Sequence, residues 1–256
     1  MNIGISRPSH SLQEAYEILE QAHALGFEGV QLKPAQYSAF KHSSEAFRSH
    51  YGALSAMTAG GLIHYPGNNL ANWQPDIGAV IRFAAATGAP HICICSGIYT
   101  TNAGDAEIRA VADALTAIGT EARQSGVIVS IHNHVDSIVE SETDIAKLLD
   151  LLDPALCGLT LDTAHAAKAG IPSVESLVRR FRKHLLNVHL KDLAPDGRFC
   201  PLGQGTVPMQ PILAALAEIG YQQWLIVDEE TPDIPSAEAL NLAHAFLVDH
   251  LMLQRR

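Results

Sequence analysis

The chain has 256 residues, of which 47% are hydrophobic, enough for one large α/β domain or two small ones. Its formal net charge of −10 argues against a nucleic-acid-binding protein, because such a protein needs a basic surface to neutralise phosphates. The apolar runs fall short of the ~20 residues that span a bilayer, and the first residues lack the pattern of a signal peptide. We therefore expect a soluble cytoplasmic protein that binds neither nucleic acid nor membrane.

The elements predicted from apolar periodicity alternate between strands and helices along the chain. The expected strands cover residues 3–6, 29–33, 54–57 or up to 63, 90–95, 127–133, 158–162, 185–191 and 223–228. The expected helices cover residues 11–25, 44–50, 73–87, 105–124, 141–152, 173–184, 208–219 and 236–253, with an irregular loop at 35–43. Ser11 with Glu14 has the pattern of a capping box, and Ser141 is the expected cap of its helix.

This alternation predicts parallel strands joined by helical crossovers. About eight such units in about 250 residues are typical of a closed (β/α)8 barrel, the TIM barrel. An open doubly wound sheet is the alternative, but it would need a glycine-rich first turn, which Gly4-Ile-Ser-Arg-Pro is not. Because no linker or change in composition marks a second domain, residues 1–256 are predicted to form a single α/β barrel domain.

Polar side chains recur where the predicted strands end. These residues are Lys33, His64, Ser96, His132, His134, Asp162, His165, His189, Lys191, Asp228 and Glu230. In a parallel barrel the active groups lie at the carboxyl ends of the strands, whereas random placement would scatter polar residues over both ends. The pattern therefore predicts that these side chains surround one active site.

Four of these residues are expected to bind one divalent metal ion. Side chains alternate along a strand, so His132, Asp162, His189 and Asp228 can all point inward from four successive strands. Two imidazoles and two carboxylates suit Mn²⁺, Co²⁺, Zn²⁺ or Fe²⁺. Such an ion polarises hydroxyl or carbonyl oxygens and stabilises enediolate-like charge, while neighbouring groups transfer protons. A single histidine at a strand end is more often a structural residue, and a single aspartate there is frequently a helix cap, so the metal prediction depends on the four residues together.

Several motifs resemble the sugar phosphate isomerase/epimerase superfamily, the xylose isomerase-like TIM barrels that include endonuclease IV and inosose dehydratase. They are Leu161-Asp-Thr-Ala-His165 followed by Ala169-Gly170, then Val188-His-Leu-Lys-Asp192, Arg198 and Gly203-Gln-Gly205. The resemblance implies one divalent ion held by Glu, Asp, His and Glu, with both glutamates exchanging protons with the substrate. By position it implies that Asp162 and His189 are ligands, that His165 lies near the substrate, and that Arg198 grips it.

The chain departs from the superfamily pattern at both glutamates. His132 stands where the first is expected and Asp228 where the second is expected, so the choices between His132 and His134, and between Asp228 and Glu230, stay open. A ketose 3-epimerase of the familiar type needs two carboxylates, and the His-Asn-His run instead resembles a branch that includes inosose dehydratase-like lyases. Phe199 stands where endonuclease IV would have a histidine, and the net charge is wrong for DNA.

We therefore predict a metal-dependent isomerase or epimerase that transfers a proton in a small ketose, polyol or keto-sugar through an enediolate. The predicted catalytic residues are His134, His165, Lys191 and Glu230, and the predicted substrate-binding residues are Arg198, His64 and Lys33. The alternatives are an inosose dehydratase-like lyase and a catalytically inactive barrel that binds a ligand. Pairing of two such barrels into a homodimer is left open.

Overall fold

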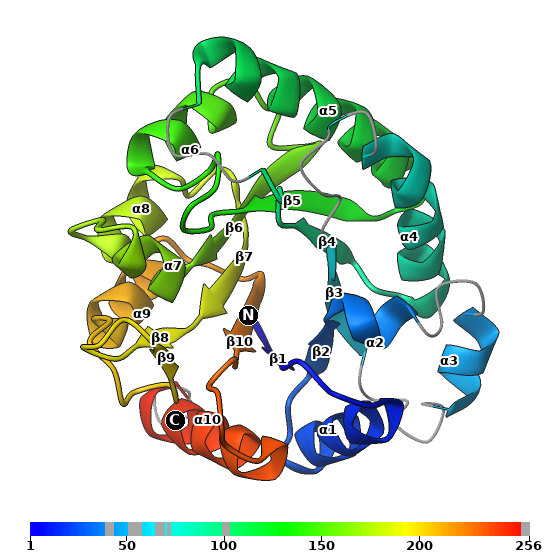
Figure 1. Cartoon of the computed structure of the whole chain (residues 1–256), viewed down its shortest axis with the longest axis vertical. Helices are drawn as coiled ribbons and strands as arrows, with labels where there is room; N and C mark the ends of the chain where they lie inside the picture. The colour runs from blue at the N-terminus through cyan, green and yellow to red at the C-terminus, as the bar shows by residue number, and fades with distance from the viewer. Residues whose placement is uncertain (39–43, 51–57, 65–69, 71–72, 99–102, 252–256) are drawn as a thin grey trace.

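The computed structural model describes residues 1–38, 44–50, 58–64, 70, 73–98 and 103–251, except for the side chains of residues 46, 50, 58–64 and 73–76. Within these residues eight strands close into a barrel in the order β1-β10-β7-β6-β5-β4-β3-β2 (Figure 1). They are β1 (Asn2–Ser6), β2 (Gly29–Leu32), β3 (Thr58–His64), β4 (His91–Ile94), β5 (Ile128–His132), β6 (Cys157–Asp162), β7 (Leu185–Leu190) and β10 (Trp224–Asp228). All neighbouring pairs are parallel, so the predicted TIM barrel is confirmed.

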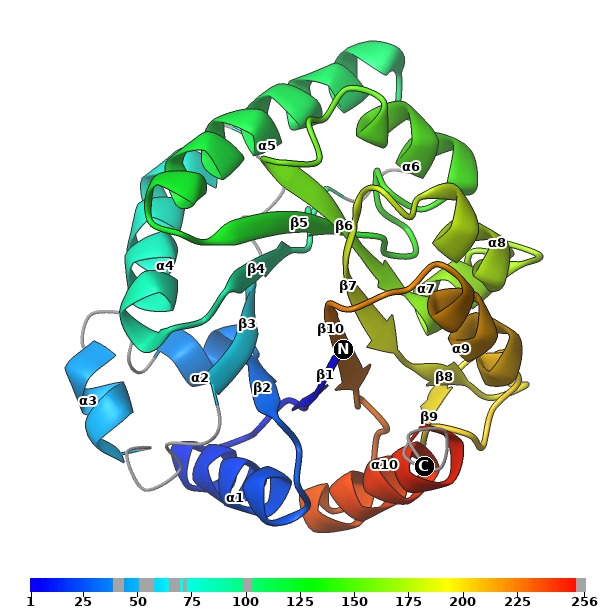
Figure 2. The same cartoon turned by 180° about the vertical axis from the view of Figure 1, so that it is seen from behind.

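Helices form a ring outside the strands (Figures 1 and 2). They are α1 (Leu12–Ala24), α2 (Pro34–Ser38), α3 (Ser44–His50), α4 (Trp73–Thr87), α5 (Asp105–Gln124), α6 (Glu142–Leu149), α7 (Thr163–Lys168), α8 (Val174–Arg180), α9 (Met209–Glu218) and α10 (Ser236–His250). The predicted caps are present, because the hydroxyls of Ser11 and Ser141 accept from the backbone N–H groups of Glu14 and Asp144, each at 3.1 Å. None of the described helices combines the length and apolar character needed to cross a bilayer.

Three segments differ from the expected elements or were not expected. Residues 34–38 form α2 where a loop was expected, because proline fits the first position of a helix, where its missing N–H is not needed. Helix α7 begins directly after β6, and a short hairpin of β8 (Asp192–Leu193) and β9 (Phe199–Cys200) follows β7. The possible strand at 54–57 and residues 39–43 of the loop expected at 35–43 lie outside the described residues.

The interior of the barrel contains a layer of buried polar side chains. His91 Nε2 lies 2.6 Å from Ser130 Oγ, which also contacts the hydroxyl of Thr160. On the other side, Asn187 Nδ2 donates to Gln31 Oε1 at 3.0 Å. Barrel interiors are more often filled by branched aliphatic residues. Gln31 connects this polar layer to His189, whose Nε2 lies 3.1 Å from Gln31 Oε1.

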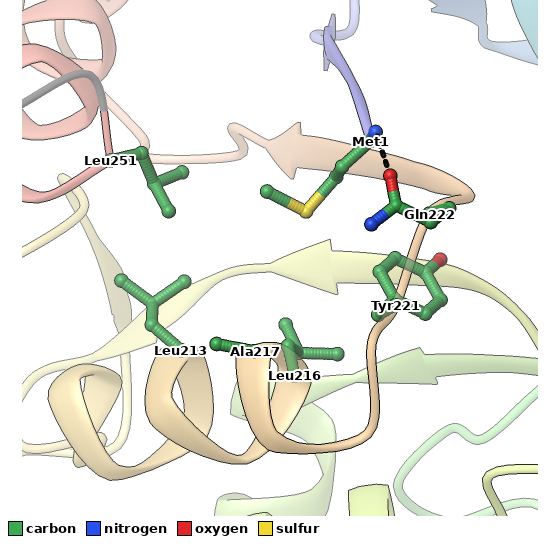
Figure 3. Close-up of a pocket in the computed structure, with 7 residues that line it drawn as sticks. All are labelled: Met1, Leu213, Leu216, Ala217, Tyr221, Gln222 and Leu251. Carbon is green, nitrogen blue, oxygen red and sulfur yellow. Dashed lines mark hydrogen bonds between the residues drawn. The ribbon is translucent and has the colours of Figure 1, made fainter. Parts of the chain in front are cut away.

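A pocket of about 390 Å³ lies near the amino-terminal ends of β1 and β10 (Figure 3). Its described lining includes apolar side chains of α9 and Leu251, and the Met1 amino group donates to Gln222 Oε1 at 3.0 Å. Active groups of a parallel barrel gather at the other end, and the described lining contains no imidazole or carboxylate. This pocket is therefore separate from the candidate site.

Candidate metal centre

Three side chains converge at the carboxyl ends of β5, β6 and β7. His132 Nε2 lies 3.1 Å from His189 Nδ1 and 3.4 Å from Asp162 Oδ2, and the third distance, between His189 Nδ1 and Asp162 Oδ2, is 3.7 Å. All three residues are buried. In the described part of the chain they are the one group of His, Cys, Asp and Glu side chains close enough together to hold a metal ion.

The chemistry of the three donors fits a divalent ion. Ligands about 2.0–2.2 Å from a tetrahedral ion lie about 3.3–3.6 Å apart, close to the separations found here. The buried Asp162 Oδ2 has no hydrogen-bond partner, which is costly for a charged oxygen unless a cation binds it. His189 Nε2 lies 3.1 Å from Gln31 Oε1, and a proton on Nε2 leaves the Nδ1 lone pair directed at the cluster. Two imidazoles and a carboxylate are ligands for Zn²⁺, Mn²⁺, Co²⁺ or Fe²⁺.

Asp162 is held in place through its backbone and through one carboxylate oxygen. The side chain of Asn133 accepts from the Asp162 N–H at 2.7 Å and donates to its carbonyl at 3.1 Å. Asp162 Oδ1 caps α7 by accepting from the backbone N–H of His165 at 2.8 Å. The helix-cap role and the proposed ligand role thus use different oxygens, Oδ1 and Oδ2.

The electrostatics of the cluster favour bound positive charge. Burial opposes ionisation of Asp162, but the surrounding histidines and Lys191 hold its pKa well below the usual value. Burial also opposes protonation of His132, but Cys95 and Asp162 together raise its pKa to about 10. Cys95 was not predicted to lie near the site, although its alternation with Cys93 along the predicted strand could have indicated an inward position.

Four charged side chains form a closed ring beside the cluster, which we call the lysine–carboxylate ring: Lys33, Asp228, Lys191 and Glu230. Lys33 Nζ lies 2.6 Å from both Asp228 Oδ1 and Glu230 Oε1. Lys191 Nζ lies 3.0 Å from Asp228 Oδ2 and also contacts Glu230 Oε2. Both oxygens of Asp228 are therefore engaged by ammonium groups. Asp228 is not part of the three-residue cluster, and its role as fourth ligand stays a prediction.

Aromatic rings form another side of the site. The ring centroids of His134 and His165 are 3.9 Å apart, and Phe199 lies 5.1 Å from His165. The ammonium of Lys191 lies 4.0 Å from the centroid of Phe199, in cation–π geometry. Burial lowers the pKa of His165 to about 2, so its imidazole is neutral near pH 7. The four predicted catalytic residues thus lie in or around one site, although their roles stay predictions.

The predicted substrate-binding residues have different positions. Lys33 belongs to the ring, whereas the Arg198 side chain is 72% exposed and pairs with Asp196 at 2.8 Å. His64 ends β3, but its side chain lies outside the described residues. Gln31 and Asn133 were not predicted for the site. Gln31 could have been found from its alternation with Lys33, and Asn133 from its place between two histidines.

The family follows from residues 19–250, which match the model of the xylose isomerase-like TIM barrel. The chain belongs to this family. Its curated relatives include inosose dehydratases: that of Geobacillus kaustophilus is 31% identical over 144 residues, 49% of this chain and 46% of the relative. The enzyme of Clostridium beijerinckii is 28% identical over 155 residues, 54% and 51% of the two chains. The chain thus spans about half the length of these relatives.

Solved structures resemble the whole chain at low sequence identity. The probable 3-DHS dehydratase AsbF of Bacillus anthracis has a TM-score of 0.81 and 14% identity, covering 97% of this chain and 99% of its own. The IOLI protein with a bound zinc atom has a TM-score of 0.78 and 19% identity, covering 99% of both chains. At these identities the likeness supports the fold alone.

Proposed function

We propose that this protein is a divalent-metal-dependent enzyme that moves a proton from the carbon next to a carbonyl in a small keto-sugar or keto-cyclitol. The observation that carries the proposal is the convergence of His132, Asp162 and His189 around Asp162 Oδ2, a buried oxygen that has no hydrogen-bond partner. When bound, the ion polarises a carbonyl or hydroxyl oxygen of the substrate. Three protein ligands are typical of catalytic zinc sites, which keep a coordination position for water or substrate.

His134 and Lys191 are suited to proton transfer in opposite directions. His134 Nδ1 donates to the carbonyl of Val135 at 2.6 Å, which leaves the lone pair on Nε2 to accept a proton from the substrate carbon. Burial opposes the charge on Lys191, but the carboxylates of Asp228 and Glu230 raise its pKa, so the side chain holds a proton near pH 7 and can hydrogen-bond to a leaving hydroxyl. His165 and Phe199 form the wall between them and exclude water from the substrate.

Loss of water is the outcome that these groups favour. An epimerase with two catalytic carboxylates would need both of them free. Here His132 stands where the first carboxylate is expected, and Asp228, at the position of the second, is bound by two lysines. In the proposed lyase reaction, His134 takes the proton from carbon and Lys191 gives one to the leaving hydroxyl. The inosose dehydratase names of the curated relatives agree with this class of reaction.

The isomerase or epimerase predicted from the sequence shares the first proton transfer. It differs in the second step, in which Lys191 returns a proton to carbon and not to a leaving hydroxyl. Lys191 directly follows β7, the strand that carries His189, so either step uses the same side chain.

Turnover in heavy water distinguishes the two outcomes. Metal-loaded protein is incubated with keto-sugars and keto-cyclitols, both neutral and carboxylated, and the products are analysed by mass spectrometry and NMR. A product lighter by one water supports the lyase, and deuterium uptake with the mass otherwise conserved supports the isomerase. Metal-stripped protein and His189→Ala are the controls and should both lose activity. Retained metal with neither reaction on any substrate would contradict the enzyme proposal and favour a ligand-binding barrel.

A further inference from the structure

We infer that Lys33 and Lys191 of the lysine–carboxylate ring form a carboxylate-binding subsite, which Glu230 occupies when no substrate is bound. The substrate then carries a carboxylate that displaces the Glu230 side chain. The inference rests on the proposed function and narrows its substrate class to carboxylated keto-polyols. An inosose has no such group.

The geometry of Glu230 is that of a bound carboxylate. Its two oxygens contact different ammonium groups, Oε1 that of Lys33 and Oε2 that of Lys191. A planar group that bridges two fixed donors in this way presents the contacts that a carboxylate ligand would make. The site also lies beside the proposed metal centre, since Asp228 Oδ2 is 3.9 Å from His189 Nδ1. A substrate carboxylate at this place would leave the rest of the molecule next to the cluster.

Glu230 is the member of the ring that can leave. Its side chain is 28% exposed, whereas those of Lys33, Lys191 and Asp228 are 7%, 2% and 3% exposed. The backbone beside it is fixed, because the N–H of Glu229 donates to the carbonyl of Ser6 at 2.8 Å and that of Thr231 to Glu229 Oε1 at 2.6 Å. Rotation of the Glu230 side chain into solvent is therefore enough to open the subsite.

The charges in the ring make the exchange selective. Two ammonium groups and two carboxylates balance, and removal of Glu230 alone would leave one positive charge in excess at a buried place. A carboxylated ligand restores the balance and the charge-assisted hydrogen bonds, so one carboxylate replaces another. A neutral polyol cannot do so, and Glu230 stays between the lysines when such a ligand binds.

The test compares a carboxylated cyclitol with a neutral one. Binding of quinate and of myo-inositol to metal-loaded protein is measured by titration calorimetry for the wild type and Glu230→Gln. The neutral amide cannot replace the carboxylate between two ammonium groups, so the variant should bind quinate about tenfold more tightly or better. Its affinity for myo-inositol should change by less than about twofold, because that neutral ligand forms no ion pair with the two lysines. Glu218→Gln, which removes an exposed surface carboxylate, is the matched control and should change neither affinity.

A double variant and a second anion test whether the two lysines form the subsite and whether it prefers carboxylates. Adding Lys33→Met to Glu230→Gln should abolish the gain for quinate. An unchanged quinate affinity, or an equal gain for myo-inositol, would overturn the subsite, and a gain for inorganic phosphate as large as that for quinate would overturn its assignment to carboxylates. Circular dichroism checks the fold, and Glu230→Ala replaces the Gln variant if the latter does not fold.

Metal content and turnover of a neutral keto-sugar are measured on the same samples. If metal content and turnover persist but Glu230→Gln binds quinate with unchanged affinity, the carboxylate subsite is excluded and the proposed function is not. If the wild type binds no metal, the proposed function fails while the quinate comparison remains valid.

Discussion

At the scale of single residues, two of the candidate ligands, Asp162 and His189, each have one atom fixed by the fold and one directed at the cluster. Asp162 uses Oδ1 for its helix and keeps Oδ2 for the site, and His189 places Nε2 against Gln31 and Nδ1 in the cluster. Strand alternation was enough to predict that Asp162 and His189 point inward. Strand alternation could not show which inward polar side chains are in contact, so the contact between Gln31 and His189 was not predicted.

Gln31→Leu should weaken metal binding by about tenfold, because His189 would lose the acceptor that orients its ring and fixes its tautomer. Competition with a chromogenic chelator measures the change. Gln31→Glu keeps an acceptor at the same place and should restore most of the affinity. Gln13→Leu, on the exposed face of α1, should have no effect. Wild-type affinity in Gln31→Leu would remove Gln31 from the support of the site.

At the scale of elements, side-chain clamps join the carboxyl ends of neighbouring strands. Asn133 joins the end of β5 to Asp162, and Thr163 Oγ1 bonds to both the N–H and the carbonyl of Lys191, at 3.0 and 2.7 Å. The hairpin of β8 and β9 continues this edge and carries Phe199 to the site. Two-residue strands are too short to give a periodic pattern, which is why the sequence did not predict this hairpin.

Asp192 is the anchor of the hairpin and its following loop. Its carboxylate accepts from four backbone N–H groups, those of Leu193, Gly203, Gly205 and Val207, at 2.8 to 3.1 Å. Asp192→Ala would leave buried donors without partners and should lower the free energy of unfolding by about 3 kcal/mol or more. Urea titration measures this change, and limited proteolysis should find new cleavage at 194–206.

Asp196→Ala is the control for this prediction, because Asp196 lies exposed in the same hairpin and bonds only to Arg198 in the described contacts. It should change stability little. Equal stability of Asp192→Ala and the wild type would show that the loop does not depend on the carboxylate.

At the scale of the whole molecule, the barrel was predictable because each βα unit carries its own apolar period and stop signals. The predicted site followed from the rule that strand ends meet at one face. The ion-pair ring was not predictable in this way, because strand position alone cannot decide whether Asp228 meets a metal ion or two lysines. The polar filling of the barrel was also unforeseen, since inward serine, threonine and histidine residues look the same in sequence as surface ones.

The polar interior should make the barrel sensitive to acid through His91. Burial lowers the pKa of His91 from 6.5 to about 3, with His189 as a smaller cause. Between these values the unfolded chain binds a proton that the folded chain does not, so stability must fall as the pH falls. The slope from this group is about 1.4 kcal/mol per pH unit. Above pH 6.5 both states are neutral and the effect is absent.

His91→Gln should flatten this dependence, because an amide can keep the contact with Ser130 but does not titrate. Urea unfolding at pH 7, 6, 5 and 4 gives the slopes for the variant and the wild type, and the difference should approach the value for one proton. His10→Gln, at an exposed position, should keep the wild-type slope. Other buried groups contribute equally to the pH dependence of both proteins. If the free energy of unfolding fell equally with pH in His91→Gln and the wild type, His91 would accept its proton without unfolding of the barrel.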